Sequence, residues 1–510
     1  MSEDSKIKQY DVIVIGSGAG NIVVDTALAA GRTVALVERK NWGGTCLNHG
    51  CIPTKILAHP ADVLRESRLY EKIGLEPGSP TIDWPRLAKR VTDKILVNRN
   101  DVETYYGSYP NCDLYHGTAS FVGEKELEVS LTDGGQARLM GESIVIACGG
   151  TSNVPPIPGL EETGYVTAES FFEKMPETLY KDVIFVGGAD IGTEFCHILS
   201  SFGCKVTLVQ RNVRLVPKQD EAISAHMLEQ FEAVGIEVLF NQHTQSAYAE
   251  GDRKYLKIQE KTTGEERTVS GEAIFISAGI VPNTADLNLE IAGVRTDEKG
   301  WIRTNEYLET TAPGVYAIGD INGLMQLRHK ANYEAEIVGY NLFLRGVEQP
   351  PRFARYDVVP SATYSFPQIG RCGLSEKAAL EKGYEISVGI HRFSDVIKTY
   401  AMGIDPDDTE NGFVKLVVER HSRKLLGIHC SGPQAAILVQ GVAWLMNAGR
   451  QPSAIRNEDI ETELSKKWRP LQAEQLIEPN TTFALSRAMT IHPALSEVVG
   501  WAPGTLVDVD

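Results

Sequence analysis

The sequence predicts an α/β protein with two Rossmann-like domains, followed by a C-terminal α+β domain. Three observations lead to this fold class: a β-α-β pattern near the start, a second copy of that pattern far downstream, and a change in the type of strand after a proline-containing linker at 347–356. The 510 residues of the chain are enough for about three domains of ordinary size.

The first β-α-β unit covers residues 10–39. YDVIVIG and TVALVER read as buried strands, and the segment between them reads as an apolar helix. The turn that opens this helix consists of Gly16, Ser17, Gly18, Ala19 and Gly20. Glycines in such a turn let the backbone reach a pyrophosphate at the helix N-terminus. Glu38 ends the second strand, where a carboxylate accepts ribose hydroxyls, so we predict a dinucleotide site here.

The same layout returns as KDVIFVGGADIG and KVTLVQR. Gly187 and Gly192 are the glycines of this second turn, and Ala189 occupies the position of the glycine that faces a pyrophosphate. The second strand ends in Gln210, where NAD-binding proteins commonly carry Asp or Glu, and Arg211 beside it can accept a 2′-phosphate. We predict a second, less regular dinucleotide site.

Two further strands complete the repeated units, IVIACGG at 144–150 and AIFISAGI at 273–280, and both end in small residues. The chain after residue 350 differs from these units. FVKLVVER and KLLGIHC predict antiparallel strands, and a helix is expected from about Gln434 to Asn447. These elements predict the α+β domain.

Composition and charge narrow the range of functions. The formal net charge of -17 would repel a nucleic-acid backbone or an anionic membrane surface, so we expect neither as a partner. The sequence shows no secretory signal pattern and no apolar run of about 18 residues, which predicts a cytoplasmic protein. Eight cysteines are too few for a disulfide scaffold of this size.

Two of those cysteines stand in the segment GGTCLNHGCIPTK, directly after the first β-α-β unit. A helix beginning near Cys46 would place the sulfurs of Cys46 and Cys51 on its first turns, close enough for a disulfide, and its N-terminal dipole would favour a thiolate. We interpret the pair as a redox-active dithiol. An inert thiol pair and half of a metal site are the alternatives. We predict no metal, because CxxC spacing and a second ligand pair are missing.

Taken together, these features resemble the flavoprotein disulfide reductases with a CxxxxC active site, the family of lipoamide dehydrogenase, glutathione reductase and mycothione reductase. The resemblance covers nearly the whole chain. Besides the redox segment, it rests on GTASF at 117–121, GVYAIGD at 314–320, HKANYEA at 329–335, PSATYSFPQIGRCGLSE at 360–376 and IHPALSE at 491–497.

The resemblance implies that the protein binds FAD and a nicotinamide coenzyme, NADPH or NADH. It also implies a division of the chain into an FAD-binding domain at 1–155 and 283–349, an NAD(P)-binding domain at 156–282, and a dimerisation domain at 350–510. Two copies of the chain are expected to form a homodimer.

Roles for the reactive residues follow from the same resemblance. Cys51 would be the thiol next to the flavin, and Cys46 would be the thiol that attacks a substrate disulfide. His492 would be the general acid and base, oriented by Glu497 and supplied by the partner subunit. Histidine suits this role because its pKa lies near neutral pH.

Lys55 and Glu194 resemble the family's ion pair beside the flavin, where a cation stabilises the reduced form. The residues expected to hold FAD are Gly16, Ser17, Gly18, Ala19, Gly20, Glu38, Gly44, Thr45, Lys55, Thr118, Ala119, Gly319 and Asp320. Those expected to hold the nicotinamide coenzyme are Gly187, Gly192, Gln210, Arg211 and Gly279.

The predicted function is the FAD-dependent reduction of a small disulfide by NAD(P)H through Cys46 and Cys51, similar to mycothione reductase. Two alternatives stay open. One is the reverse reaction on a dithiol, as in a dihydrolipoyl dehydrogenase. The other is a flavin electron-transfer or partner-binding protein with a degenerate nicotinamide site, because Asp190 and Ile280 stand where the family usually has an aromatic residue and an arginine.

Two features depart from the family pattern. His49, between the redox cysteines, is predicted to perturb the thiolate pKa, with simple space filling as the alternative. Residues 449–490 are longer than the family usually carries before its His-Pro motif, and Asn457 is predicted to cap a helix running to Trp468. We expect this segment to roof the substrate cleft, to dock a partner or to pack at a dimer interface.

Overall fold

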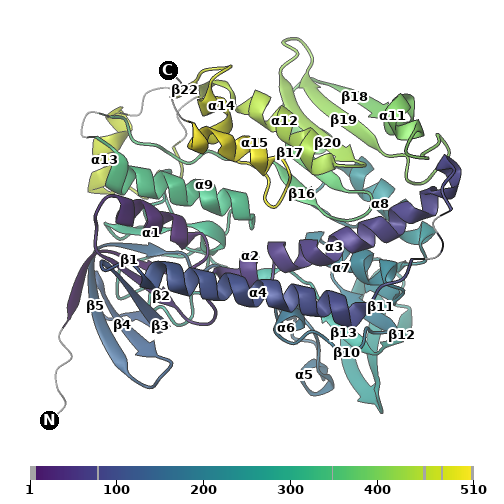
Figure 1. Cartoon of the computed structure of the whole chain (residues 1–510), viewed down its shortest axis with the longest axis horizontal. Coiled ribbons are helices and arrows are strands. Elements are labelled where there is room, and N and C mark those ends of the chain that lie inside the picture. The colour runs from purple at the N-terminus through teal and green to yellow at the C-terminus, as the bar shows by residue number, and fades with distance from the viewer. Residues whose placement is uncertain are drawn as a thin grey trace.

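The structure is a computed structural model that describes residues 7–76, 78, 80–346, 349–451, 455–471 and 475–506. Its main sheets divide the chain into three regions (Figure 1). Two of the regions are Rossmann-like and the third is an α+β region, which confirms the predicted fold class. The boundaries of the domains within the chain stay a prediction.

The first region is built on a sheet that joins the beginning of the chain to a strand near residue 316. Its strands are β1 (Lys8–Ile15), β2 (Val34–Glu38), β3 (Cys112–Phe121), β4 (Glu126–Leu131), β5 (Gln136–Ile146) and β15 (Val315–Ala317). The order β3, β2, β1, β5, β15 is parallel throughout, and β4 pairs antiparallel with both β3 and β5. Residues 12–14 of β1 are fully buried, because helices and strands cover both faces of a parallel sheet.

The second region repeats this plan on a smaller parallel sheet with the strand order β13, β7, β8, β9. These strands are β13 (Ala273–Ile276), β7 (Asp182–Val186), β8 (Lys205–Val209) and β9 (Glu237–Leu239). An antiparallel sheet follows β9, made of β10 (Gln242–Glu250), β11 (Arg253–Glu260) and β12 (Glu266–Gly271). The short strands β6 (Gly150–Ser152) and β14 (Ile280–Pro282) pair with each other where the chain enters and leaves this region.

Helices lie on the faces of both parallel sheets. In the first region they are α1 (Gly20–Ala29) and α9 (Arg328–Gly339), which pack against each other. In the second region they are α5 (Leu160–Thr163), α6 (Ala168–Glu173), α7 (Asp190–Ser201) and α8 (Glu221–Ala233). The long helices α3 (Cys51–Glu66) and α4 (Trp84–Gly107) run from the first region to the second, where α3 packs on α7 (Figure 1).

The third region is an antiparallel sheet in the order β16, β17, β20, β19, β18. Its strands are β16 (Ser361–Thr363), β17 (Ile369–Gly373), β18 (Ile386–Arg392), β19 (Phe413–Glu419) and β20 (Leu425–Ser431). Its helices are α10 (Glu376–Glu381), α11 (Ile397–Tyr400) and α12 (Ala435–Asn447). The predicted antiparallel pairing of β19 with β20 and the predicted helix after them are both confirmed.

After α12 the chain leaves this sheet, reaches the first region and comes back. We call the described part of this excursion, residues 455–471 and 475–491, the return segment. It contains α13 (Glu463–Trp468), which lies near α9, and it ends with α14 (Thr482–Ser486) before the terminal helix α15 (Glu497–Trp501) (Figure 1). The strands β21 (Gly449–Gln451) and β22 (Gln475–Ile477) pair antiparallel where the chain leaves the third region and returns to it.

The predicted cap of α13 is wrong. Asn457 lies well before the helix, and Thr462 caps it by accepting a hydrogen bond from the amide of Ser465, whose hydroxyl in turn accepts from the amide of Thr462. Asn457 instead donates to the carbonyl of Thr304 in the first region, 2.7 Å away. This long-range partner explains why a local helix signal places the helix start too early.

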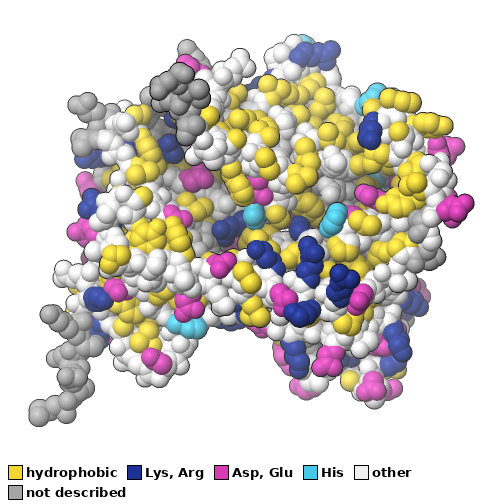
Figure 2. Space-filling view, viewed as in Figure 1, with side chains coloured by type: hydrophobic (Ala, Val, Ile, Leu, Met, Phe, Trp, Pro, Cys, Tyr) yellow, Lys and Arg dark blue, Asp and Glu magenta, His cyan; other side chains and the backbone are white. Residues whose placement is uncertain are grey.

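The surface of the third region is apolar around α12. Figure 2 shows hydrophobic side chains gathered there, whereas Lys and Arg side chains gather over α3 and α4. The exposed apolar residues of α12, α14 and α15 include Leu438, Leu445, Phe483, Val498 and Trp501. Exposed apolar surface of this kind is typical of a face that packs on another protein. Among the described residues, no helix is both long and apolar enough to cross a membrane.

Candidate active site

The two redox cysteines lie on two successive helices and not on one, which corrects the sequence prediction. Cys46 belongs to the short helix α2 (Gly44–Asn48), and Cys51 is the first residue of α3. The break at Gly50 brings them together: a Cβ atom on Gly50 would lie 3.2 Å from the carbonyl oxygen of Thr45 and 3.3 Å from the Cα of Cys46. Glycine permits this close approach of α3 to α2.

Gly44 fixes the redox helix against the first dinucleotide turn. Its φ angle is +67°, and a Cβ atom added to it would lie 2.6 Å from the Cα of Gly18. A side chain at this position would therefore push α2 away from the turn that opens α1. The contact places the redox pair directly beside the predicted pyrophosphate site.

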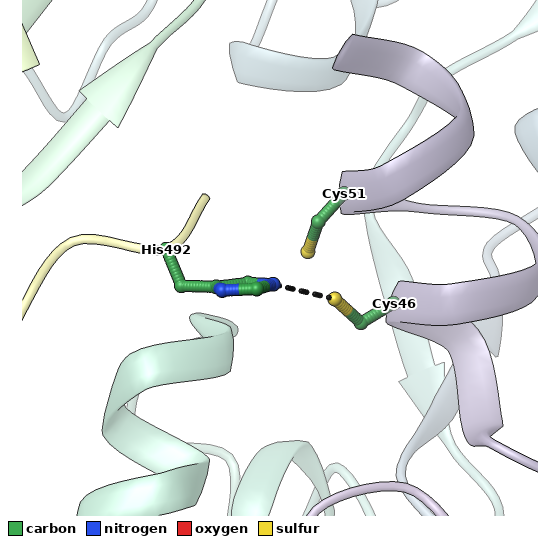
Figure 3. A group of neighbouring side chains, drawn as sticks. All are labelled: Cys46, Cys51 and His492. Atoms are coloured by element: carbon green, nitrogen blue, oxygen red, sulfur yellow. Dashed lines mark hydrogen bonds between the residues drawn. The ribbon is translucent and has the colours of Figure 1, made fainter. Parts of the chain in front are cut away.

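His492 completes a compact group with the two thiols (Figure 3). Its Nε2 atom lies 3.3 Å from the Sγ atom of Cys46, and the two sulfurs and a ring nitrogen of His492 all lie within 4.8 Å of one another. The other ring nitrogen, Nδ1, lies 2.7 Å from a carboxylate oxygen of Glu497. A carboxylate at Nδ1 holds the proton on that nitrogen and leaves Nε2 facing the thiol as a base.

This His492 belongs to the same chain as the cysteines, whereas the resemblance implied that the partner subunit supplies it. Three further contacts hold the His-Pro loop within the chain. The amide of His492 donates to Nδ1 of His329, 3.4 Å away, the hydroxyl of Tyr364 donates to the carbonyl of Pro493, and Glu497 accepts from the amide of Ala494. The described chain thus brings the two thiols, the imidazole and the carboxylate into one place.

The two thiols differ in acidity. The hydrogen bond with Cys51 lowers the pKa of Cys46, and the nearby cations of Arg328 and Lys55 lower it further, although burial acts in the opposite direction. The same hydrogen bond, together with burial, raises the pKa of the Cys51 thiol. Cys46 is therefore the first of the pair to ionise, as its predicted role in attacking a disulfide requires.

Lys55 and Glu194 form the predicted ion pair. The Nζ atom of Lys55 lies 2.8 Å from one carboxylate oxygen of Glu194 and 3.0 Å from the other. Tyr364 supports both members of the pair, because its ring centroid lies 4.5 Å from the ammonium group and its amide donates to Glu194 over 2.8 Å. The pair joins α3 of the first region to α7 of the second.

These groups line one cavity of about 410 Å³ that runs from the redox pair to the first dinucleotide turn. Most of the residues predicted to hold FAD line it: Gly16, Ser17, Gly18, Ala19, Glu38, Gly44, Thr45, Lys55, Thr118, Ala119, Gly319 and Asp320. Gly20 does not line the cavity. A Cβ atom there would lie 2.6 Å from a methyl group of Val14, so Gly20 allows α1 to pack closely on β1.

The cavity fits a flavin dinucleotide. A Cβ atom on Gly18 would have no neighbour closer than 3.8 Å, which leaves room over the turn for a pyrophosphate at the N-terminus of α1. Glu38 accepts hydrogen bonds from the amide of Ser17 at 3.0 Å and from its hydroxyl at 2.7 Å, so its carboxylate is held at the ribose end. Bound FAD would supply two-electron transfer between a nicotinamide coenzyme and the Cys46–Cys51 pair.

The motif HKANYEA supplies a buried ion pair that holds the turn at Gly319 beside the cavity. Lys330 and Glu334 form a fully buried ion pair of 3.1 Å on α9. Lys330 donates to the carbonyl of Gly319, and Glu334 accepts from its amide at 2.7 Å, so the pair clamps the turn that carries Asp320. Burial raises the pKa of Asp320 to about 6.

The second dinucleotide region has a different arrangement. None of Gly187, Gly192, Gln210, Arg211 and Gly279 lines the cavity described above. The side chain of Gln210 is buried, accepts from the amide of Gly188 over 3.1 Å and donates to the carbonyl of Arg214 over 3.0 Å. Asp190 does line the cavity, and it accepts from the hydroxyl of Thr363 over 2.7 Å.

His49 lines the same cavity as the two thiols and lies near a carboxylate. Its Nε2 atom lies 3.6 Å from Glu173 at the end of α6, and burial lowers the pKa of its ring. The groups that chiefly shift the pKa of Cys46 are Cys51, Arg328 and Lys55, and His49 is not among them. An effect of His49 on the thiolate and a space-filling role both stay predictions.

Several functional residues had no signal in the sequence. Arg328, the first residue of α9, lines the cavity and lowers the pKa of Cys46, but it stands just outside the HKANYEA motif. Tyr364 lies inside the motif at 360–376, but that motif does not indicate a role for it. Asn48 joins the site to α4, because it accepts from Arg99 and donates to the carbonyl of Gly44. These residues act on parts of the chain that lie far from them in sequence, so no local pattern identifies them.

Comparisons with known proteins agree with this geometry. Residues 10–335 match the family model described as pyridine nucleotide-disulphide oxidoreductase, and residues 359–460 match the dimerisation domain of the same family. Mycothione reductase of Mycobacterium tuberculosis is 32% identical over 87% of this chain and 94% of its own length. Dihydrolipoyl dehydrogenase of Chlorobaculum tepidum is 32% identical over 86% of this chain and 90% of its own.

A solved structure adds to these relatives. The HOCl-induced flavoprotein disulfide reductase RclA from Escherichia coli has a TM-score of 0.73 and 26% sequence identity, and the match covers 86% of this chain and 93% of that one. A flavoprotein disulfide reductase thus shares this fold over most of both chains.

Proposed function

The chain belongs to the pyridine nucleotide-disulphide oxidoreductase family, and on that premise we propose that it uses NADPH or NADH to reduce a small disulfide through Cys46 and Cys51. The family membership makes it an FAD-dependent oxidoreductase that acts on sulfur groups. The observation that carries the proposal is the position of His492, whose Nε2 atom lies 3.3 Å from the Sγ atom of Cys46.

The first half of the reaction opens the substrate. The thiolate of Cys46 attacks one sulfur of the substrate disulfide, so that a bond forms between Cys46 and that sulfur and the substrate's own S–S bond breaks. The leaving thiolate takes a proton from His492, whose imidazolium form is stabilised by the carboxylate of Glu497 at 2.7 Å. The lowered pKa of Cys46 favours this order of events.

The second half releases the product. Cys51 gives up its proton to His492 and attacks the sulfur of Cys46. The Cys46–Cys51 disulfide forms, the bond to the substrate breaks, and the second substrate thiolate leaves with that proton. Bound FAD would supply the two-electron transfer from NAD(P)H that restores the two thiols, with a second proton taken up at His492 from solvent. Each turn of the cycle would then consume one coenzyme for each disulfide.

We further propose that two copies of the chain form a homodimer through the apolar face of α12, α14 and α15. The match to the family's dimerisation domain at 359–460 supports this, as do the exposed side chains of Leu445, Val498 and Trp501. The cytoplasmic location stays a prediction from the sequence.

Anaerobic titration tests the proposed function. The oxidised flavoprotein is titrated with NADPH and, separately, with NADH, and flavin absorbance is followed together with the long-wavelength absorbance of a thiolate beside flavin. We expect reduction by at least one coenzyme, and Cys51→Ser should lose the long-wavelength band. No reduction by either coenzyme would refute the proposal.

A panel of substrates then identifies the direction and the acceptor. Lipoamide, glutathione disulfide and mycothione are offered with the preferred coenzyme, and dihydrolipoamide is offered with NAD in the reverse direction. Turnover with a disulfide supports reduction as the physiological direction. Turnover confined to dihydrolipoamide and NAD would favour a dihydrolipoyl dehydrogenase, which the identity values alone do not separate from mycothione reductase.

A further inference from the structure

We propose that Asp190 shifts the preference of the nicotinamide site toward the oxidised form of the coenzyme, because its carboxylate adds a negative charge where the second region borders the cavity. The inference deepens the proposed function and rests on it, since it requires that the second region binds NADPH or NADH.

Asp190 is the first residue of α7, the helix that follows the second dinucleotide turn. No side chain caps α7, so the amides of its first turn are left to bind an anionic pyrophosphate. Gly192 lets the helix pack closely on the turn, because a Cβ atom there would collide with the carbonyl oxygen of Gly187. The turn and the helix therefore fit a coenzyme whose pyrophosphate lies at the N-terminus of α7.

The first turn of α7 borders the cavity that holds the redox pair. Asp190 and Ile191 line this cavity, as does Glu194 one turn later. Asp190 and Ile191 are exposed, whereas residues 192–199 of the same helix are all buried. A coenzyme that extends from the N-terminus of α7 toward the flavin thus passes the side chain of Asp190.

The third region holds the carboxylate of Asp190 in place. Thr363 on β16 is buried, and its hydroxyl donates to Oδ1 of Asp190 over 2.7 Å. Arg371 is the nearby cation, but its guanidinium donates to the hydroxyl of Ser361 over 3.1 Å and to the carbonyl of Lys218 over 2.7 Å. Burial lowers the pKa of Arg371, and the charge of Asp190 acts in the opposite direction. Within the described ranges, no cation forms an ion pair with Asp190.

Most of the other charges that line the cavity are balanced by three ion pairs: Lys55 with Glu194, Arg39 with Asp286, and Lys40 with Glu169. Arg328 lies beside the first turn, with its guanidinium 3.8 Å from the place of a Cβ atom on Gly18. Glu38 and Asp320 also belong to the part of the cavity predicted to hold FAD. The carboxylate of Asp190 is therefore the charge left without a counter-charge beside α7.

The two forms of the coenzyme differ in charge at the nicotinamide. The reduced ring is neutral, whereas the oxidised ring carries a positive charge. A carboxylate beside the ring stabilises the oxidised form, and the attraction is stronger where the ring and the protein exclude water. A site with this preference makes the bound reduced coenzyme a stronger electron donor, as the reduction of a disulfide requires.

The phosphates of the coenzyme are the same in both forms, so repulsion between them and Asp190 weakens both forms equally. The ratio of the two dissociation constants therefore isolates the charge of the nicotinamide. This ratio is the quantity that tests the proposal.

Titration of the oxidised holoenzyme measures the ratio. One titration uses the oxidised form of the coenzyme that reduces the flavin, and the other uses its tetrahydro form, whose ring is neutral but gives no hydride. Calorimetry and the change in flavin absorbance yield both dissociation constants. We expect Asp190→Asn to weaken binding of the oxidised form roughly tenfold and to change binding of the tetrahydro form by less than about twofold. Equal changes for the two forms would overturn the proposal.

Two control variants separate the charge of Asp190 from other effects. Thr363→Val removes the hydroxyl but keeps the carboxylate, so the ratio should change less than in Asp190→Asn. Asp286→Asn makes the same substitution at the Arg39 end of the cavity and should leave the ratio at its wild-type value. A change in either control as large as that in Asp190→Asn would refute the role of the Asp190 charge.

Anaerobic reduction of the flavin distinguishes this inference from the proposed function. If the coenzyme reduces the wild-type flavin but Asp190→Asn leaves the ratio unchanged, only the inference about Asp190 is refuted. If the wild-type protein neither binds nor is reduced by either coenzyme, the proposed function is refuted and the inference fails with it.

Discussion

The two dinucleotide regions share the backbone conformation of the turn after their first strand, but they differ in the charge of the side chain that bonds to that turn. Gly16 and Gly187 both have positive φ angles, +103° and +111°. A Cβ atom on either would collide, at 2.5 and 2.4 Å, with the carbonyl oxygen of the residue that follows the neighbouring parallel strand. In both regions a residue at the end of the second strand, Glu38 as the last residue of β2 and Gln210 directly after β8, accepts a hydrogen bond from the amide that follows the first glycine of the turn. That residue is the carboxylate of Glu38 in the first region and the neutral amide of Gln210 in the second.

The difference leads us to expect that the repeated fold sets where a dinucleotide lies, while single side chains select between one dinucleotide and another. Glu38 can only accept hydrogen bonds and therefore favours free ribose hydroxyls. Gln210 carries no charge, so we expect Arg211 beside it to be able to attract a 2′-phosphate. Position 18 is Gly in the first turn, and the corresponding residue of the second turn is Ala189, which we expect to crowd a bound pyrophosphate. Exchanging these residues between regions tests the comparison.

The largest effect is expected from Gly18→Ala, which gives the first turn the residue of the second. The variant should fold, because a Cβ atom there has no neighbour closer than 3.8 Å in the chain. The methyl group would occupy the space of the pyrophosphate and weaken FAD binding by roughly 10- to 100-fold. The ratio of flavin absorbance to protein absorbance after gel filtration measures this. Full retention of flavin would contradict the assigned pyrophosphate site.

Glu38→Gln replaces the carboxylate of the first region with the neutral amide that the second region has at the corresponding position. Replacing a charged acceptor with a neutral one should weaken FAD binding about tenfold, or about 1.4 kcal/mol. Fluorescence titration of the apoprotein with FAD measures the change. The matched control is the reciprocal exchange Gln210→Glu, which should leave the affinity for FAD unchanged. Equal affinities of the Glu38→Gln variant and the wild-type protein would show that the carboxylate does not contact the ribose.

Gln210→Glu also tests the second region on its own. A carboxylate at this position would repel a 2′-phosphate and accept ribose hydroxyls, so the preference between NADPH and NADH should move toward NADH by roughly tenfold. Steady-state kcat/KM values for the two coenzymes measure the preference. An unchanged ratio would show that Gln210 does not face the adenosine ribose.

Ala189→Gly gives the second turn the residue of the first. Removing the methyl group should ease the approach of the coenzyme pyrophosphate and lower KM by a few-fold, an effect of about 1 kcal/mol or less. Stopped-flow reduction of the flavin at increasing coenzyme concentration measures it. A rise in KM would mean that the methyl group packs against the coenzyme and does not crowd it.

The smallest effect is expected from Lys55→Met, which removes a positive charge near the dithiol. Lys55 lowers the pKa of Cys46, so in Lys55→Met the thiol should ionise at higher pH, and alkylation by iodoacetamide at neutral pH should slow by a few-fold. Lys55→Arg keeps the charge and should keep the profile. The double variant with Glu194→Gln shows whether an unpaired carboxylate contributes. A shift toward lower pH would contradict the assigned sign.

Much of the fold and site can be predicted because the relevant residues are neighbours in the sequence. The turn from Gly16 to Gly20, the strand that ends at Glu38 and the pair Cys46 and Cys51 all lie within a short stretch, so spacing alone indicates that they lie close together. The ion pair of Lys55 with Glu194 follows only from the family resemblance, because 139 residues separate the two.

The wrong predictions involve contacts that a local pattern does not describe. The spacing predicts a single helix over Cys46 and Cys51, but the close approach at Gly50 breaks it into α2 and α3. The cap of α13 is misplaced because Asn457 is engaged by Thr304 in another region. No pattern in the sequence indicates that Arg328 acts on Cys46 across the cavity.

The sequence by itself determined the two β-α-β units and the redox dithiol, because periodicity, glycine positions and cysteine spacing are local properties. Only the tertiary structure decided that His492 lies beside Cys46 of its own chain, 446 residues away in sequence. Its position depends on the packing of Trp468 in an aromatic cluster, on two hydrogen bonds from the Gln440 side chain to the backbone just before His492, and on the hydrogen bond from the His492 amide to His329. These are long-range contacts that no local pattern encodes.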